Sequence, residues 1–274
     1  MVSPTRRYVV LSKKLGETPL QTLEAFKDSN PEYKNVPATY AGRLDPMAEG
    51  NLLVLLGDEC KNQEKYRGLD KEYEIEVLLD VSTDTGDVLG LPSYAKKNTA
   101  LNTTKLSEAL RSLIGSKEIP YPAFSSKTVN GKPLFLYSLE GTLGSIEIPT
   151  HIETIYSIQV LDSTLVTKDI VEKRIYEILS HAPRSDHPTK TLGADFRQDE
   201  IRDAWKNVFA NIEERTFQTL TLRITCASGS YMRTLAERIG RTHNTNGMAV
   251  SIKRNKIGKY QKLGPISFWT KEYR

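Results

Sequence analysis

The chain has 274 residues and a formal net charge of +4 at pH 7, which is enough for one large domain or two small ones with a substantial core. No apolar run approaches the roughly 20 residues of a membrane-spanning helix, and the basic start at 1–7 precedes an apolar stretch too short for a signal peptide. Two cysteines, Cys60 and Cys226, provide no disulfide framework. We therefore expect a reduced, cytoplasmic protein with no membrane partner. The mild positive charge is compatible with a nucleic-acid partner but does not require one.

The N-terminal part predicts a strand followed by a helix. Residues 8–11 are β-formers, and Lys13 follows them in a charged segment that fits a loop end. Thr18 is the expected N-cap, because a proline comes next and Gln21 completes a capping box. Asn30 before a proline ends the helix. The face expected to be buried contains Leu20, Leu23 and Phe26.

Asp45 lies in the most informative segment of the chain. Because a proline follows it, Asp45 is expected in an extended or turn conformation, and Gly42 and Gly50 permit tight turns on either side. Residues 52–56 then predict a strand buried on both faces. A carboxylate on a rigid loop beside a core strand is placed as a reactive acid should be. The same residues also fit a capped surface turn.

Residues 71–83 alternate between apolar and acidic side chains and predict one half-buried strand. Tyr73 is on its core face at the entrance, where a tyrosine usually packs with its hydroxyl paired. The polar turn at 82–87 lacks the full spacing of a calcium loop, so we predict no metal site.

The middle of the chain predicts a helix at 104–114 and a loop or exposed hairpin at 118–134. The helix ends at a glycine, and its inward residues are Leu106, Leu110, Leu113 and Ile114. The second segment has three prolines and an Asn130-Gly131 turn. Its Lys127 and Lys132 could contact phosphate groups or lie in solvent.

The last third begins with strand-like alternation at 150–165 and a helix at 170–180, followed by a linker or loop at 182–199. A helical apolar stripe then contains Ile201, Ala204, Trp205, Val208 and Phe209. A half-buried strand is expected at 220–226 and a helix from about 231 to 239, capped by Ser230 and ended by Gly240. Arg233 would lie in the first turn of this helix, where the dipole disfavours a cation by roughly 0.3–1 kcal/mol. Its position suggests a nearby anion.

Three separated motifs together resemble the TruB family of tRNA pseudouridine synthases. The family motif Gly-x-Leu-Asp-Pro-x-Ala-x-Gly matches residues 42–50, Lys-x-Tyr matches residues 71–73, and Cys-Ser-x-Gly-Thr-Tyr-x-Arg-x-Leu resembles residues 226–235. A closing motif places Ile252, Arg254, Gly258 and Tyr260 in matching positions. The sequence departs at two points, since Thr39-Tyr40 stands where the family has Gly-His and Arg43 precedes Leu44-Asp45.

The resemblance covers residues 8–260, with a divergent insert at about 162–215. It implies an α+β pseudouridine synthase fold: a mixed, largely antiparallel sheet with flanking helices and a central RNA-binding cleft. We expect a single catalytic domain at 1–274 without the C-terminal PUA domain that bacterial members usually carry. It also implies that the enzyme isomerises a uridine to pseudouridine without a metal or an organic cofactor, and the expected target is the T-loop uridine of tRNA. The expected partner is the T stem-loop of tRNA, and we expect a monomer.

Site roles follow from the same resemblance. Asp45 would be the nucleophile or base, Tyr73 would stack on the target base, and Arg233 would pair with Asp45. The expected substrate-binding residues are Lys13, Tyr40, Arg43, Lys127, Lys132 and Tyr231. Three alternatives stay open: a synthase of the same fold acting on another RNA, an RNA-binding or folding chaperone with little catalysis, and an N-glycoside hydrolase that would release free uracil.

Overall fold

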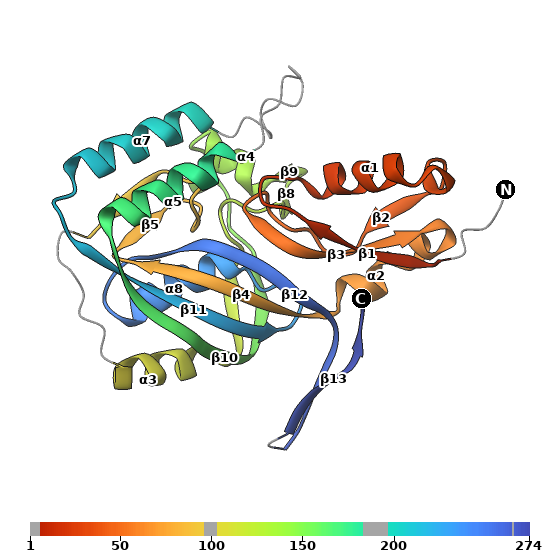
Figure 1. Ribbon diagram of the computed structural model, residues 1–274. Helices are drawn as coiled ribbons and strands as arrows, with labels where there is room; N and C mark the ends of the chain where they lie inside the picture. Colours follow the sequence, from red (N-terminus) through yellow and green to blue (C-terminus); the bar gives the residue numbers. More distant parts are fainter. Residues whose placement is uncertain (1–5, 96–102, 183–196, 265) are drawn as a thin grey trace.

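The computed structural model describes residues 6–95, 103–182, 197–264 and 266–274. A nine-stranded sheet runs through these parts in the order β1-β3-β12-β4-β11-β10-β7, with β2 on β3 and β13 on β12 (Figure 1). All pairs are antiparallel except β3 with β12. The strands are β1 (Tyr8–Lys13), β2 (Ala38–Tyr40), β3 (Ala48–Leu56), β4 (Asp70–Leu79), β7 (Gly115–Pro120), β10 (Thr150–Thr167), β11 (Thr216–Cys226), β12 (Gly247–Leu263) and β13 (Ile266–Glu272).

Helices flank this sheet, so the predicted α+β class with a mixed, largely antiparallel sheet is confirmed. They are α1 (Pro19–Ser29), α2 (Gln63–Arg67), α3 (Thr103–Leu113), α4 (Leu134–Leu139), α5 (Lys168–Ser180), α7 (Gln198–Asn211) and α8 (Met232–Thr242). In Figure 1, α8 lies behind β4 and β12, and α5 lies on the near side. Two short hairpins complete the fold, β5 (Val81–Thr83) with β6 (Pro92–Tyr94) and β8 (Thr128–Val129) with β9 (Lys132–Pro133). In the described ranges, no helix has the length and apolar character needed to cross a membrane.

The start of α1 has the predicted capping box, since Thr18 and Gln21 each bond the other's backbone N–H. The predicted buried face is only partly right. Leu23 is buried and Phe26 packs beside it, but Leu20 is 47% exposed. The helix rests on β1 and β3 along a narrow stripe, and Thr22 occupies the buried position, where its hydroxyl donates to Glu17 at 2.9 Å.

Two predicted boundaries were wrong. The strand expected at 71–83 is interrupted at Asp80, whose φ of 68° bends the chain between β4 and β5, and Arg215 pairs with this carboxylate at 2.8 Å. Helix α8 does not end at Gly240 but continues to Thr242. A Cβ on Gly240 would lie 2.4 Å from backbone atoms of the following turn, so this glycine permits close contact inside the helix.

Smaller corrections concern caps and exposure. Tyr231, not Ser230, occupies the N-cap position of α8, and the Ser230 hydroxyl instead donates to the Ala227 carbonyl at 3.2 Å. Ile114 follows the last residue of α3 and is 37% exposed, so it does not belong to the inward face. The strands at β10 and β11, helix α5 and the buried stripe of α7 are confirmed. Most of the linker predicted at 182–199 lies outside the described residues.

Gly50 shows why β3 and β12 can lie so close together. Its φ is +102°, and a Cβ there would be 2.4 Å from the Arg254 carbonyl oxygen. We expect Gly50→Ala to lower the free energy of unfolding by about 2–4 kcal/mol, from backbone strain and steric overlap. Urea unfolding measures this. Gly68→Ala is the control, because no heavy atom lies within 4 Å of that added Cβ; an equal loss in both variants would contradict the explanation.

Candidate active site

Asp45 lies on the loop that leads into β3. Leu44 and Met47 are buried on either side of it and anchor the loop, and the Ala48 N–H donates to the Asp45 carbonyl at 2.9 Å. The Asp45 side chain itself is 47% exposed. The loop therefore holds a fixed backbone and presents one carboxylate toward solvent.

Arg233, the second residue of α8, contacts this carboxylate from the opposite side of the site. Its Nε donates to Asp45 Oδ2 at 2.7 Å, Nη1 to the Thr85 carbonyl at 2.6 Å, and Nη2 to the Phe124 carbonyl at 3.0 Å. Burial alone would lower the pKa of Arg233, but the charges of Asp45 and Asp87 outweigh it and raise the pKa. The guanidinium is thus a permanent cation with its orientation fixed by three bonds.

A second carboxylate, Asp87, faces Arg233 from the loop after β5. Its Oδ2 is 3.6 Å from Arg233 Nε, and its Oδ1 accepts from the Thr85 hydroxyl at 2.8 Å and the Leu89 N–H at 2.9 Å. From the sequence, this turn is predicted only as a polar loop, and no role is predicted for Asp87. The available signal was its place in the Thr-Asp-Thr-Gly-Asp turn. Among the described residues no His, Cys, Asp or Glu side chains gather in a group of three that could hold a metal ion.

Asp87 provides a pH-dependent test of this arrangement. Burial raises its pKa to about 6, and Arg233 opposes that rise. The protonated form is favoured in the folded state, so this contribution to the free energy of unfolding is fully present only below the ordinary carboxyl pKa of 3.8, and it is lost as the pH rises through 6. Relative to Asp87→Asn, whose amide does not titrate, we expect the wild type to lose up to about 3 kcal/mol of unfolding free energy between pH 4 and pH 7. Urea unfolding of the wild type and of Asp87→Asn at several pH values across that range would measure this loss. The same pH dependence of the unfolding free energy in both proteins would contradict the prediction.

Tyr73, in β4, is paired with Ile224 of β11 and Arg254 of β12 and is 9% exposed. Burial raises the pKa of its hydroxyl, Arg254 opposes the rise, and Asp45 adds to it. The phenol therefore stays protonated at neutral pH. Arg254, which is paired with Tyr73 in the sheet, also donates to the Gly42 and Arg43 carbonyls of the Asp45 loop, so Tyr73 lies close to that loop.

Lys13, the last residue of β1, is only 1% exposed. Its ammonium donates to three backbone carbonyls, those of Ala48, Pro46 and Lys14. Burial lowers its pKa to about 8, against the charges of Glu17 and Asp45. The structure therefore places Lys13 as a support of the Asp45 loop and not at an accessible surface.

The other predicted contact residues lie around the site at different depths. Arg43 is exposed two residues before Asp45. The partly buried Tyr40 ring packs against the apolar cluster that contains Val9, Leu52 and Val54. Its position in the family motif is thus occupied by a packing side chain in this chain.

Lys127, Lys132 and Tyr231 lie in or beside the segment at 118–140. The ammonium of Lys127 is 5.0 Å from the centroid of the Tyr121 ring, whereas Lys132 forms an ion pair with Glu140 and lies over the Tyr137 ring. The ring of Tyr231 stands edge-on to Tyr121 and His151, which stack with centroids 4.2 Å apart. No sequence pattern predicts this stacked pair, because its members are 30 residues apart and belong to no motif.

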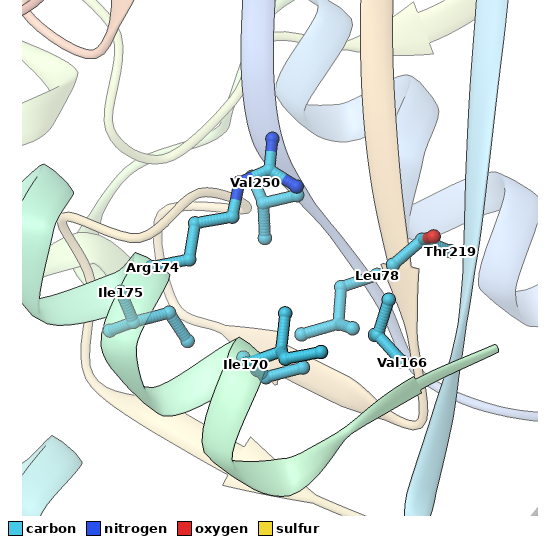
Figure 2. Close-up of a pocket in the computed structure, with 8 residues that line it drawn as sticks. Leu78, Val166, Ile170, Arg174, Ile175, Thr219 and Val250 are labelled. Carbon is cyan, nitrogen blue, oxygen red and sulfur yellow. The ribbon is translucent and has the colours of Figure 1, made fainter. Parts of the chain in front are cut away.

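A small apolar crevice lies elsewhere, between α5 and the sheet (Figure 2). Arg174 at its rim is paired with Glu76 of β4. The crevice contains none of the residues described above, and its lining offers no acid, base or nucleophile. Its lining residues are Leu78, Val166, Ile170, Val171, Arg174, Ile175, Thr219 and Val250.

Comparison with known proteins identifies the family of this chain. The family model described as TruB family pseudouridylate synthase (N terminal domain) matches residues 32–174, just over half of the chain. This chain belongs to the TruB pseudouridylate synthase family. The match includes Asp45, Tyr73 and Asp87, while Arg233 and Arg254 lie beyond it.

Relatives with curated names support the same membership. The chain is 25% identical over 261 residues to tRNA pseudouridine synthase B of Idiomarina loihiensis, covering 94% of this chain and 65% of that protein. It is 25% identical over 255 residues to the protein of the same name from Psychrobacter arcticus, covering 92% and 53%. The TruB-family chain thus spans about half to two thirds of the length of these relatives.

A solved structure confirms the predicted pseudouridine synthase fold. A chain from a crystal structure of a Cbf5-Nop10-Gar1 complex matches with a TM-score of 0.53 at 15% sequence identity. The match covers 92% of this chain and 48% of the other chain. At this identity the similarity concerns the fold alone.

Proposed function

We propose that this protein is an RNA pseudouridine synthase that isomerises the T-loop uridine of tRNA. The observation that carries the proposal is the bond from Arg233 Nε to Asp45 Oδ2, on a loop beside Tyr73, in a chain of the TruB family. The named relatives are tRNA pseudouridine synthases. Binding alone would need a basic surface and not this fixed carboxylate.

The arrangement supports each requirement of the isomerisation. The C1′–N1 bond of the uridine breaks, and its electron pair stays with uracil. Asp45 either attacks C1′ or removes a neighbouring sugar proton, with Arg233 fixing its orientation. The uracil then turns, its C5 bonds to C1′, the C5 proton leaves and N1 gains a proton. The atoms balance without a co-reactant, and Tyr73 offers a ring on which the extruded base can stack.

We further propose that the described parts form one catalytic domain, which acts as a monomer in the cytoplasm. The shared nine-stranded sheet supports the single domain, since Asp45, Tyr73 and Arg233 come from segments joined by it. Lys127, Arg43 and Tyr231 are the accessible candidates for RNA contact. Lys132 can serve in that way only after it leaves Glu140.

A synthase of the same fold acting on another RNA is the second candidate. Thr39 and Tyr40 replace the family's Gly-His pair, and the Tyr40 ring packs among apolar residues. A different contact between the residue at this position and the target base would change which RNA loop the enzyme accepts.

Unmodified tRNA transcripts test both candidates. We expect pseudouridine at the T-loop uridine, mapped by nuclease digestion and mass spectrometry, and none there when that uridine is replaced by cytidine. Product only in another RNA would favour the second candidate, and release of free uracil would indicate hydrolysis. Tight binding to all RNAs tested without product would contradict the synthase assignment.

A further inference from the structure

Three cations are buried beneath the Asp45 loop. Lys13, Lys71 and Arg254 are 1%, 5% and 1% exposed. They come from β1, β4 and β12, which the sheet brings together around β3. In the described parts of the chain, none of the three forms an ion pair. All three donate to backbone carbonyls, and the Arg254 guanidinium also interacts with the Tyr73 hydroxyl.

Arg254 makes three of these bonds. Its Nε donates to the Asn51 carbonyl at 2.8 Å, Nη1 to Arg43 at 3.2 Å, and Nη2 to Gly42 at 3.3 Å. Lys13 binds the carbonyls of Pro46 and Ala48 on the other side of Asp45. Two buried cations therefore hydrogen-bond to the loop backbone on both sides of Asp45.

Lys71 lies close to Arg254. A Cβ added to Gly42 would be 3.8 Å from Arg254 Nη1 and 3.9 Å from Lys71 Cε, so both side chains converge beneath this glycine. The Lys71 ammonium donates to the carbonyls of Arg67 and Leu69. Burial lowers the pKa of Lys71 to about 8, and the charge of Arg254 contributes to the lowering.

Placing like charges together in the interior is unfavourable for stability. A buried charge normally has a charged partner, and carbonyl dipoles compensate only part of its lost hydration. Such an arrangement is expected where function requires it. The positive field already acts on the site, since Arg254 opposes the rise in the pKa of Tyr73.

We propose that Arg254, with Lys71 behind it, is a positioning residue that holds the Asp45 loop and provides the positive charge that stabilises the detached uracil anion. This inference rests on the proposed function. When the C1′–N1 bond breaks, the electron pair stays with uracil, which is anionic until C5 bonds to C1′. A fixed cation behind Tyr73 lowers the energy of that anion without touching it. Among the described residues, the other charged side chains at or beside the Asp45 loop include Lys13, Arg43, Asp87 and Arg233.

The test separates charge from hydrogen bonding. Arg254→Gln removes the charge and keeps a donor, whereas Arg254→Lys keeps the charge and loses the three-pronged geometry. In single-turnover assays on the tRNA transcript, we expect the glutamine variant to be slower by roughly 10- to 100-fold, because a distant charge should matter less than a direct oxyanion donor. The lysine variant should recover most of the rate. Filter binding should give wild-type RNA affinity for both, because a buried side chain cannot contact RNA.

Lys253→Gln is the matched control. Lys253 is exposed on the same strand as Arg254, and the substitution also removes one positive charge. Its single-turnover rate should equal that of the wild type. If thermal melting shows that Arg254→Gln is unfolded, the same comparison of a charge-removing with a charge-keeping variant is made with Lys71→Gln and Lys71→Arg. A wild-type rate in the glutamine variants, or equal losses in the glutamine and lysine variants of Arg254, would overturn the inference. Pseudouridine formed by the wild-type enzyme in the same assay tests the proposed function independently, so a failure of the Arg254 inference can be distinguished from a failure of the proposed function.

Discussion

Asp45→Asn is expected to abolish pseudouridine formation, with a rate at least about 10⁴-fold below wild type. The amide is nearly isosteric and its oxygen can still accept a bond from Arg233. It can neither attack C1′ nor take a proton, so only the chemical step is lost. Because the Asp45 side chain is half-exposed, the folded state should change little. Single-turnover assays with mass-spectrometric detection of pseudouridine measure the effect.

The control for Asp45→Asn is RNA affinity and thermal stability, both of which should stay close to wild type. Asp58→Asn provides a matched substitution, since that carboxylate is exposed and forms an ion pair with the exposed Lys61 three residues later. Its rate should be unchanged. Equal product from the Asp45 variant and the wild type would show that another residue performs the chemistry.

Arg233→Met is expected to have the largest effect on stability. It leaves the buried carboxylate of Asp87 without its cation, and breaking a buried ion pair typically costs about 3–5 kcal/mol. The contact with Asp45 adds little to this loss, because Asp45 can be hydrated. At pH 5 the loss should be smaller than at pH 7, because Asp87, whose pKa is already raised by burial, then becomes protonated. Urea unfolding at the two pH values measures both effects.

Two variants define what Arg233 contributes. Arg241→Met removes a cation from the same helix whose side chain is 75% exposed, and it should change stability by no more than about 0.5 kcal/mol. Arg233→Lys keeps a charge but cannot bond Asp45 and two carbonyls together, so we expect roughly a 10²-fold loss of rate with a smaller loss of stability. Full activity in Arg233→Lys would mean that charge alone suffices.

The sequence predicted the residues that local patterns position. A proline after Asp45 and flanking glycines define its loop, and an arginine in the first turn of α8 indicated the nearby anion that the structure contains. The capping box of α1 was found for the same reason, because each of its bonds joins residues three apart. The catalytic role assigned to Asp45 stays a prediction.

Other residues could not be found in this way because their roles depend on tertiary contacts. Arg254 and Asp87 gain their importance from partners far away in the chain, such as Gly42 and Arg233. The exposure of Leu20 and the packing of Tyr40 depend on where α1 and β2 rest on the sheet. The ion pair of Lys132 with Glu140 depends on how the hairpin folds back on α4. Periodicity predicts a face of an element but not the surface that covers it.

The place of β12 in the sheet has a consequence for biosynthesis. This late strand lies between β3 and β4, so it separates the element after Asp45 from the one that holds Tyr73. Because β12 begins at Gly247 of 274 residues, about nine-tenths of the chain emerges during translation before the strand that joins these halves, and long-range pairing of this kind is slow to form. A nascent chain that has not yet released β12 should have no assembled site, and its unpaired strand edges would be candidates for chaperone binding.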